Sequence, residues 1–544
     1  MIVFLNRETF DKFNLNEEDY QLMKEAEKNA KKDTAASTDS KDKKAAPAKK
    51  EAAKDIVVEP EGLARRTVRL TPFSSSIGDY IVTKDGEKLY YTVQSNGDGK
   101  RDLWSIDLRK GTPTQVKRDM GFGGMEMDKD GKIYILGSRS QRLDPKTGKT
   151  TPITMNGTQL INHDAERNYM FDYVKVQEGK RFYNTNMHGI DWEKMTEDYR
   201  KFMPHINNNY DFAEMLSELL GELNVSHTGG RYTPPRNPNV EPTAALGLLF
   251  DMAYNGKGLK VDEVVAGGPF DKAASKVTPG CIIEKINETV LTPTTDDSEV
   301  LNGLAGQKTL ITVYNPANGQ RWEETVKPIS AAQMNNLMYD RWVASRAAEV
   351  DRLSNGRLGY VHIKSMNDDS FRPMYSDVLG KYNDREGIVI DIRHNGGGRL
   401  HEDLEVFFSG KKYLTQVVRG QETCDMPSRR WNKPSIMLQS EACYSNAHGS
   451  PWVYKTMGIG KLVGAPVPGT MTSVNWVTMQ DPTMVFGIPV VGYLTAEGNY
   501  LENTQLEPDV LVLPNPGDVN SGDDKQLKAA VETLLKDIDA QKKK

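Results

Sequence analysis

The chain has 544 residues, too many for one ordinary domain, and a prior of about 150 residues per domain suggests three or four. Charged residues make up 27% and hydrophobic residues 38%, which is typical of a globular protein, and the net charge of -5 gives no reason to expect nucleic acid or an anionic membrane as partner. The three cysteines, Cys281, Cys424 and Cys443, are too few for a disulfide framework, and no spacing suggests a metal site. No apolar run approaches the roughly 20 residues of a membrane-spanning helix.

The first 160 residues predict a β-rich region with a charged insertion. The opening MIVFLNRETF predicts a strand and a turn, lacks the segments of a signal peptide, and is expected of a piece of a longer protein. Residues 17–60, rich in Lys, Ala, Glu and Asp, predict a solvated helix or a disordered insertion. From about residue 61 to 160, short strands and polar turns recur with a period of roughly 40 residues, which fits β-propeller blades or a small β-meander.

Three further regions follow in chain order. Between residues 161 and 240, apolar residues at helical spacing predict helices, one of them capped by Asp211 and ending near Gly221. Residues 241–329 alternate strands, Gly/Pro turns and one short helix. Residues 330–544 predict an α/β layout, because LGYVHI and GIVIDIR are typical of buried strands and KQLKAAVETLLKDIDAQ is an amphipathic helix.

The segment GIVIDIRHNGGG is the strongest local signal for chemistry. A buried strand ends at Asp391 and Arg393, and Asn395 and three glycines, residues 396–398, follow it. Glycines let the backbone approach a ligand and turn N–H groups toward an anion, as acyl transfer requires of an oxyanion site. An ordinary turn after a strand is the alternative interpretation.

A second signal lies some 50 residues further on, where a strand leads through a turn with Ser445 into a helix. A serine there is exposed beside helix N-terminal N–H groups, which suits a nucleophile. A helix cap is the commoner use of serine at such a place, and the GGG segment shifts the balance toward the nucleophile.

Together the two segments resemble the tail-specific peptidase superfamily, in which a D-x-R-x-N-x-G-G strand end precedes the nucleophile turn. The common branch of that superfamily uses a lysine about 25 residues after the serine as its base. Here that neighbourhood reads PGTMTSVNW without a lysine, and Lys461 lies nearer, in the GIGKLVG turn. The base is therefore expected elsewhere.

The segments MHGIDWEKM, SELLGELNVSH and GNYLENTQLEPDV are similar to the tricorn branch of these peptidases. That resemblance implies a network in which Glu502 orients Ser226 and His227, with His227 as base to Ser445. It also implies an oxyanion hole made by the N–H groups of Gly398 and Asn446. Two departures are Asn446, where the family has an acidic residue, and Gln505, where it has a glycine.

The same resemblance places Asp425 where an acidic residue selects basic P1 side chains, with a surface acid as the alternative. His448, three residues after Ser445, is the competing base, although one turn of helix is poor geometry for that role. His394 sits in the glycine loop. His188 and His362 are expected to be structural or hydrogen-bonded.

The resemblance implies a multidomain α+β chain. Its parts are partial β-propeller blades (residues 1–160, insertion at 17–60), a helical domain with the catalytic histidine (161–240), a PDZ-like domain (241–329) and a crotonase-like α/β catalytic domain (330–544). The predicted function is a serine peptidase that trims oligopeptides made by other proteases. A tail-specific processing protease and an inactive PDZ/propeller scaffold are the alternatives.

The expected partners are peptide substrates and further copies of the chain, as a hexamer by resemblance, with no nucleic acid and no membrane span. No metal or organic cofactor is implied. The expected compartment is the cytoplasm, or the periplasm if an upstream signal peptide is missing.

Overall fold

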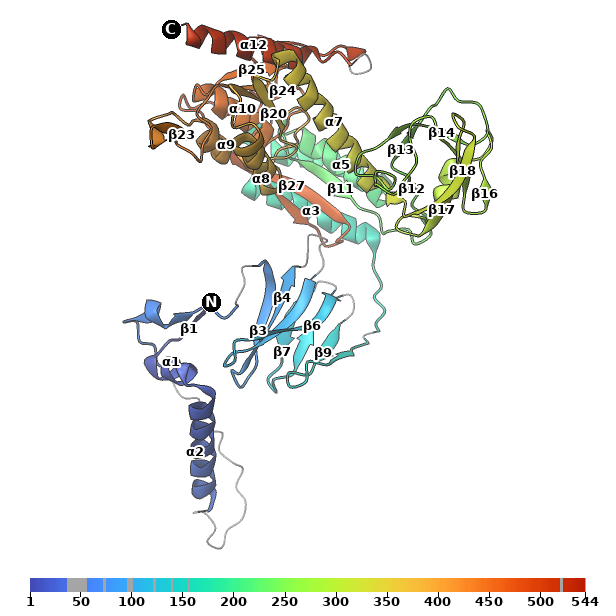
Figure 1. The fold of residues 1–544 in the computed structure, drawn as a ribbon. Coiled ribbons are helices and arrows are strands. Elements are labelled where there is room, and N and C mark those ends of the chain that lie inside the picture. Colours follow the sequence, from blue (N-terminus) through green and yellow to red (C-terminus); the bar gives the residue numbers. More distant parts are fainter. Residues whose placement is uncertain are drawn as a thin grey trace. The chain divides into compact units, whose positions relative to one another are not determined.

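The computed structural model describes residues 1–36, 56–71, 75–94, 101–120, 124–137, 140–154, 156–518 and 522–543. The chain divides into two compact units, residues 1–160 and 161–544, and each is described here by itself. Figure 1 shows the elements in sequence colours. The first unit is β-rich, whereas the second mixes helices with parallel and antiparallel sheets.

The N-terminus forms a strand, as the sequence predicts, and then a helix where a turn was predicted. Strand β1 (Ile2–Val3) pairs antiparallel with β2 (Thr67–Val68). Helix α1 (Arg7–Asn14) forms because the Asn6 side chain accepts a hydrogen bond from the backbone N–H of Thr9 and caps the first turn. Helix α2 (Glu17–Ala36) begins the charged segment, and residues 37–55 of the predicted insertion lie outside the described residues.

Two four-stranded antiparallel sheets account for the rest of the first unit. The first contains β3 (Ile77–Val82), β4 (Lys88–Gln94), β5 (Arg101–Asp107) and β6 (Pro113–Met120), and the second contains β7 (Met125–Met127), β8 (Ile133–Ile135), β9 (Gln141–Leu143) and β10 (Thr150–Pro152). Buried residues from both sheets, among them Tyr90, Leu103 and Ile133, form one cluster. The repeated short strands are confirmed, and their assignment to propeller blades stays a prediction.

The second unit begins with helices packed on a small sheet. The helices are α3 (His163–Arg181), α4 (Trp192–Arg200) and α5 (Asn209–Gly221). Asp211 was expected to cap α5, which is wrong: the N-cap is Asn208, three residues earlier, and its side chain accepts the N–H of Asp211. The sheet order is β11 (Gly229–Tyr232), β27 (Met484–Gly492), β26 (Thr472–Thr478), so strands from late in the chain complete this helical region.

A separate antiparallel sheet forms the middle of the second unit. Its strands are β13 (Leu248–Phe250), β14 (Leu259–Val264), β15 (Ile282–Ile286), β16 (Thr289–Val290), β17 (Thr309–Asn315) and β18 (Gln320–Val326), with the short helix α6 (Asp297–Leu301). They enclose a core that includes Phe270, Ile283 and Val313. Strands β12 (Ala244–Ala245) and β19 (Ile329–Ser330) pair where the chain enters and leaves this module.

A five-stranded parallel sheet carries the candidate site. Its order is β20 (Leu358–His362), β21 (Gly387–Asp391), β24 (Ser435–Gln439), β25 (Lys461–Gly464) and β28 (Val510–Leu511). The helices around it are α7 (Ala331–Ser354), α8 (Asp368–Ser376), α9 (His401–Phe408), α10 (Asn446–Thr456) and α12 (Lys525–Lys542). Every residue of β21 and β24 is buried, as expected of central strands covered on both faces.

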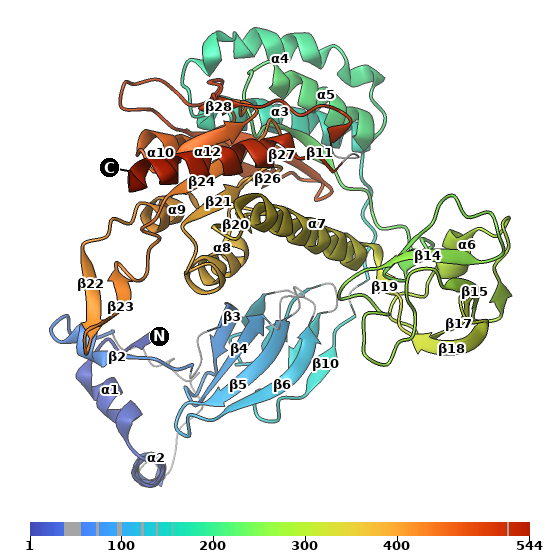
Figure 2. The same cartoon turned by 45° about the horizontal axis from the view of Figure 1, so that its top comes forward.

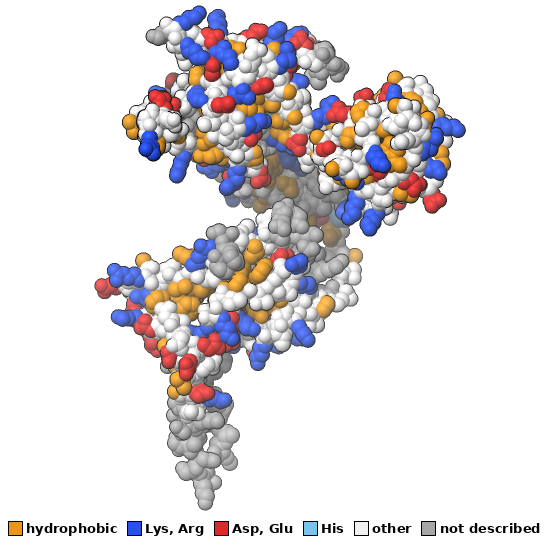
Figure 3. All heavy atoms as spheres, in the orientation of Figure 1, with side chains coloured by type: hydrophobic (Ala, Val, Ile, Leu, Met, Phe, Trp, Pro, Cys, Tyr) orange, Lys and Arg blue, Asp and Glu red, His pale blue; other side chains and the backbone are white. Residues whose placement is uncertain are grey.

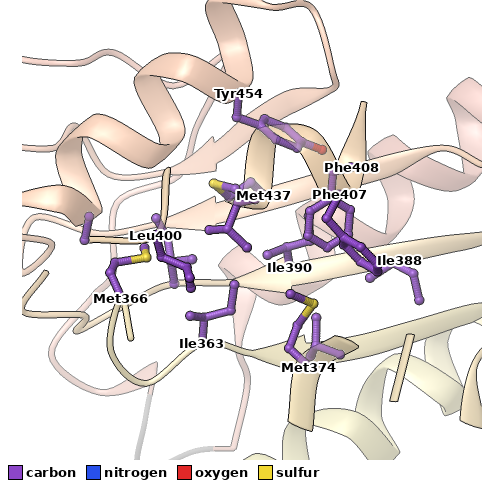
Figure 4. Close-up of a cluster of buried hydrophobic side chains, with 14 of the residues drawn as sticks. Ile363, Met366, Met374, Ile388, Ile390, Leu400, Phe407, Phe408, Met437 and Tyr454 are labelled. Carbon is purple, nitrogen blue, oxygen red and sulfur yellow. The ribbon is translucent and has the colours of Figure 1, made fainter. Parts of the chain in front are cut away.

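Two hydrophobic clusters explain that burial. One joins strands β21 and β24 to α8, α9 and α10, and Figure 4 shows Ile390 and Met437 of the sheet beside Phe407 and Tyr454 of the helices. The other joins the sheet to α7 and α12, and Figure 2 shows both helices. The predicted amphipathic C-terminal helix is thus confirmed as α12, with its apolar side packed on the sheet.

The surface carries mixed charge. On the face shown in Figure 3, Lys/Arg and Asp/Glu side chains are interspersed on each unit. Within the described residues, no helix combines the length and the apolarity needed to cross a membrane.

Candidate active site

Ser445 stands at a sharp turn between β24 and α10. Its backbone has φ 58° and ψ -125°, a conformation that non-glycine residues rarely adopt and that costs roughly 1–3 kcal/mol. It occupies the N-cap position of α10, yet its side chain makes no cap hydrogen bond. Its N–H donates to Thr470 Oγ1 at 3.0 Å. The Ser445 side chain therefore does not cap α10, and its hydroxyl remains available to act as a nucleophile.

Ser226, His227 and Glu502 form one hydrogen-bonded chain, although 276 residues separate Ser226 from Glu502. Glu502 Oε1 accepts the backbone N–H of Ser226 at 2.5 Å, and its Oε2 accepts the Ser226 hydroxyl at 2.9 Å. Ser226 Oγ also lies 2.8 Å from His227 Nδ1. Since the hydroxyl's single proton points to Glu502, Oγ can only accept from Nδ1–H. This pattern leaves His227 Nε2 unprotonated, the tautomer that a general base needs.

Thr472 joins this chain and was not predicted from the sequence. Its Oγ1 lies 3.0 Å from His227 Nδ1 and 3.1 Å from Ser226 Oγ, and it is almost fully buried. Strand β26 positions it, because β26 pairs with β27, which in turn pairs with β11, a strand that begins two residues after His227. A threonine in a strand is ordinary, so no local signal in the sequence marks it.

Burial changes the pKa values of His227 and Glu502, the two ends of this hydrogen-bonded network. Burial lowers the pKa of His227 to about 4, so the imidazole is neutral at ordinary pH. Burial also raises the pKa of Glu502, while the two hydrogen bonds from Ser226 oppose that shift. A neutral base beside a carboxylate that accepts two hydrogen bonds is the arrangement that proton abstraction requires.

The backbone N–H groups of Gly398 and Asn446 have no recorded acceptor in the described part of the chain. Gly398 follows Gly397, whose backbone is so close to Ser445 that an added Cβ would lie 2.5 Å from Ser445 Cβ and 3.0 Å from Asn446 N. Met366 flanks the loop, donating to Gly397 O and accepting from Arg399 N, which leaves the Gly398 N–H free of that pairing. The loop that carries Gly398 thus packs against the turn that carries Ser445 and Asn446, and the oxyanion role of the two N–H groups stays a prediction.

The Asn446 side chain caps helix α9. Its Oδ1 accepts the backbone N–H groups of Leu400 at 2.8 Å and His401 at 3.1 Å, at the start of α9. Helix α9 has no cap from its own N-cap side chain, so Asn446 supplies that function. The departure from an acidic residue is therefore accommodated, since an amide oxygen accepts the same hydrogen bonds.

The first half of DIRHNGGG is structural. Asp391 and Arg393 form a buried ion pair, and Arg393 also contacts Asp524, the N-cap of α12. Asn395 holds the second half: its Nδ2 donates to Ile363 O at 2.7 Å and its Oδ1 accepts the Gly397 N–H at 2.8 Å. Asn395 thus links the glycine loop to the backbone at Ile363 and fixes the conformation of the loop.

Among the described residues, Asp425, Lys461 and His362 have no recorded contact with the Glu502–Ser226–His227 cluster, whereas His188 interacts electrostatically with Glu502. Asp425, on the hairpin of β22 (Leu414–Val418) and β23 (Gln421–Met426), forms an ion pair with Lys412 at 2.7 Å and has no recorded contact with Ser445. Lys461 pairs with Asp537 at 2.8 Å. His188 lies 2.6 Å from the Tyr183 hydroxyl, and a tyrosine likewise contacts His362. No hydrogen bond joins the Ser445 hydroxyl to His227 among the described residues; such bonds are often long before substrate binds.

His448, the competing base, is fully buried, and neither ring nitrogen has a hydrogen-bond partner among the residues that the structure describes. Its ring therefore makes no hydrogen bond to the Ser445 hydroxyl, and the contact between the two residues is the backbone one, in which His448 N–H donates to Ser445 O at 2.7 Å. Burial lowers the pKa of His448 to about 4 from its ordinary 6.5. The unfolded chain binds this proton between pH 6.5 and about 4 and the folded chain does not, so stability is lost as pH falls through that window.

We expect His448→Leu to keep activity and to make the fold less sensitive to acid. Replacing an unpartnered buried imidazole by an apolar side chain of similar size costs little at pH 7. At pH 4.5 the variant should retain about 2–3 kcal/mol of unfolding free energy that the wild type loses. Urea unfolding at pH 7 and 4.5 measures this. A folded variant that no longer reacts with a serine-directed probe would instead make His448 the base.

Comparison with known proteins shows which peptidases the chain resembles. Two family profiles match: Peptidase family S41 over residues 357–512 and the Tricorn protease C1 domain over residues 163–221. The chain is 27% identical over 452 residues to Tricorn protease homolog 1 of Streptomyces coelicolor, covering 81% of this chain and 40% of that protein. The chain is thus similar to tricorn-like peptidases of family S41. The resemblance seen in the sequence is confirmed.

Two further matches describe its extent. The tricorn-like chain is 22% identical over 500 residues to the Tricorn protease of Thermoplasma acidophilum, covering 86% of this chain and 45% of that one. It matches the crystal structure of the tricorn protease with a TM-score of 0.75 at 18% identity, over 90% of this chain and 49% of that chain. The tricorn-like chain thus shares that fold and spans less than half the length of these relatives.

Proposed function

We propose that the chain is a serine peptidase in which Ser445 is the nucleophile and His227 the base. The observation that carries this proposal is the hydrogen-bonded chain from Glu502 through Ser226 to His227 Nδ1, which leaves Nε2 as a proton acceptor. Ser445 supports it from the other side, because its strained, uncapped turn presents a free hydroxyl.

The proposed reaction uses these residues in turn. His227 Nε2 takes the proton of Ser445 as the hydroxyl attacks the peptide carbonyl, and it gives that proton to the leaving amine. The N–H groups of Gly398 and Asn446 receive the oxyanion. Water, activated by the same imidazole, then releases the acyl group from Ser445. Ser226, Thr472 and Glu502 stabilise the imidazolium that forms twice in this cycle.

The proposed substrates are oligopeptides made by other proteases, with a preference for basic P1 residues. Asp425 is the proposed selecting carboxylate, held on a two-stranded hairpin, and a basic P1 side chain would replace Lys412 as its ion-pair partner. The proposal includes blade-like sheets in residues 1–160, a PDZ-like module in residues 241–329, a crotonase-like catalytic domain and a hexamer. The similarity to tricorn proteases supports these parts of the proposal.

The test is labelling with a fluorophosphonate probe together with hydrolysis of peptides that carry Arg, Lys or Leu at P1. We expect the wild type to be labelled, and Ser445→Ala and His227→Ala to lose labelling while remaining folded. Labelling lost only in Ser445→Ala would move the base to another group. A folded wild type that is neither labelled nor active would contradict the proposal and favour a non-catalytic scaffold.

A further inference from the structure

The backbone of His227, the proposed base, has an unusual conformation. His227 has φ 64°, and Asn224, three residues earlier, has φ 45°. Both values lie in the left-handed region that L-residues seldom adopt, so this connection between α5 and β11 must be held by its surroundings. In the described part of the chain, the backbone N–H of His227 has one recorded acceptor, the hydroxyl of Tyr444, at 2.7 Å.

The same tyrosine lies against the imidazole itself. The rings of His227 and Tyr444 have centroids 4.6 Å apart and are tilted by 41°. Tyr444 therefore contacts His227 twice, once at the backbone and once at the side chain. The contact is long-range, because 217 residues separate the two positions.

Tyr444 is fixed at its other end to the nucleophile and to the glycine loop. It directly precedes Ser445, its N–H donates to Asn395 O at 3.0 Å, and its carbonyl accepts from Ala447 N at 3.0 Å. A Cβ added to Gly397 would lie 2.7 Å from the Tyr444 carbonyl oxygen. The backbone of Tyr444 thus shares the rigid frame of the nucleophile and the glycine loop.

We infer that Tyr444 is a positioning residue that holds the base His227 at a set distance and angle from the nucleophile Ser445. This inference rests on the proposed function and adds a residue to it. One side chain spans from the element that carries the nucleophile to the separate element that carries the base. A misplacement of about 1 Å between such groups lowers rates by about 100-fold, so a rigid aromatic link has a clear use.

The two parts of the contact can be separated by substitution. Tyr444→Phe keeps the ring and removes the hydroxyl that accepts the His227 N–H, and we expect kcat to fall about 3- to 10-fold with KM unchanged. Tyr444→Ala also removes the ring, and we expect a fall of about 100-fold. Tyr210, an exposed tyrosine on α5 whose ring makes an edge contact with Tyr232, provides matched controls, Tyr210→Phe and Tyr210→Ala, with unchanged kinetics.

A second measurement follows the imidazole directly and does not depend on turnover. The ring of Tyr444 helps to bury His227, and burial lowers the pKa of that imidazole. The titratable groups recorded around His227 are Tyr444 and, through Ser226, Glu502. In Tyr444→Ala the His227 pKa should rise toward 6.5, seen by NMR of histidine labelled with carbon-13 and as an acid limb of kcat/KM displaced to higher pH. Tyr210→Ala should shift neither.

The outcomes are distinct. A lower kcat in both Tyr444 variants, with the NMR shift in Tyr444→Ala, supports the inference. Unchanged kcat in Tyr444→Phe and an unmoved His227 titration in Tyr444→Ala would overturn it. A change in KM alone would overturn it in favour of a substrate contact. A wild type that neither hydrolyses peptides nor labels would sink the proposed function, and the His227 titration in the same samples would still decide whether Tyr444 positions the imidazole.

Discussion

Glu502→Gln is expected to lower kcat by about 10³- to 10⁴-fold without unfolding the protein. The carboxylate accepts two hydrogen bonds from Ser226, one from the backbone and one from the hydroxyl. An amide offers one oxygen and one NH₂ group, so one of these contacts becomes donor against donor. If the NH₂ group faces Ser226 Oγ, the hydroxyl turns its proton toward His227 Nδ1. The imidazole proton then moves to Nε2, the nitrogen that must be unprotonated to act as the base.

Steady-state kinetics and the rate of probe labelling measure this effect, and urea unfolding checks the fold. Glu507→Gln is the matched control, since Glu507 is an exposed residue on the same segment, outside the hydrogen-bonded chain. Its kinetics should equal those of the wild type. If Glu502→Gln retains activity within tenfold of the wild type, Ser226 does not depend on Glu502 for its orientation, and the tautomer argument fails.

Gly397→Ala is expected to lower kcat by about 100-fold or more, because the new methyl group would meet the nucleophile. The added Cβ would lie 2.5 Å from Ser445 Cβ, 2.7 Å from Tyr444 O and 3.0 Å from Asn446 N. Real Cβ atoms do not approach backbone or side-chain atoms this closely, so the glycine loop and the nucleophile turn must separate. The residue also has φ 96°, which strains any L-residue.

The chain supplies a neighbouring control. Gly396→Ala adds the same methyl group one residue earlier, where nothing lies within 4 Å and φ is outside the left-handed region. We expect near wild-type kcat for Gly396→Ala, and a lower melting temperature for Gly397→Ala by a few degrees, from roughly 1–2 kcal/mol of backbone strain. Comparing labelling rates per folded molecule separates the effect on the site from the effect on stability. Equal rates in the two variants would contradict the close packing of this loop on Ser445.

The sequence by itself determined the elements whose signals are local. The buried runs LGYVHI and GIVIDIR became strands β20 and β21, and the amphipathic spacing of KQLKAAVETLLKDIDAQ became α12. Such patterns are readable because burial repeats along one segment. The sequence predicted Asp211 as the cap of α5, whereas the structure has Asn208 in that place. Several Asn and Asp residues stand together there, and each is able to start a helix.

The sequence also determined which residues to inspect at the site, because Ser445, the glycine loop and the Ser226–His227 pair stand in recognisable motifs. Only the tertiary structure decided how they meet. Strand β27 pairs with β11 across more than 200 residues and with β26 on its other side, and this arrangement brings Thr472 of β26 to His227. Tyr444 likewise contacts His227 from a distant segment. Sequence periodicity indicates which face of a segment is buried, but not which other segment covers that face. These contacts could therefore not be predicted from the sequence.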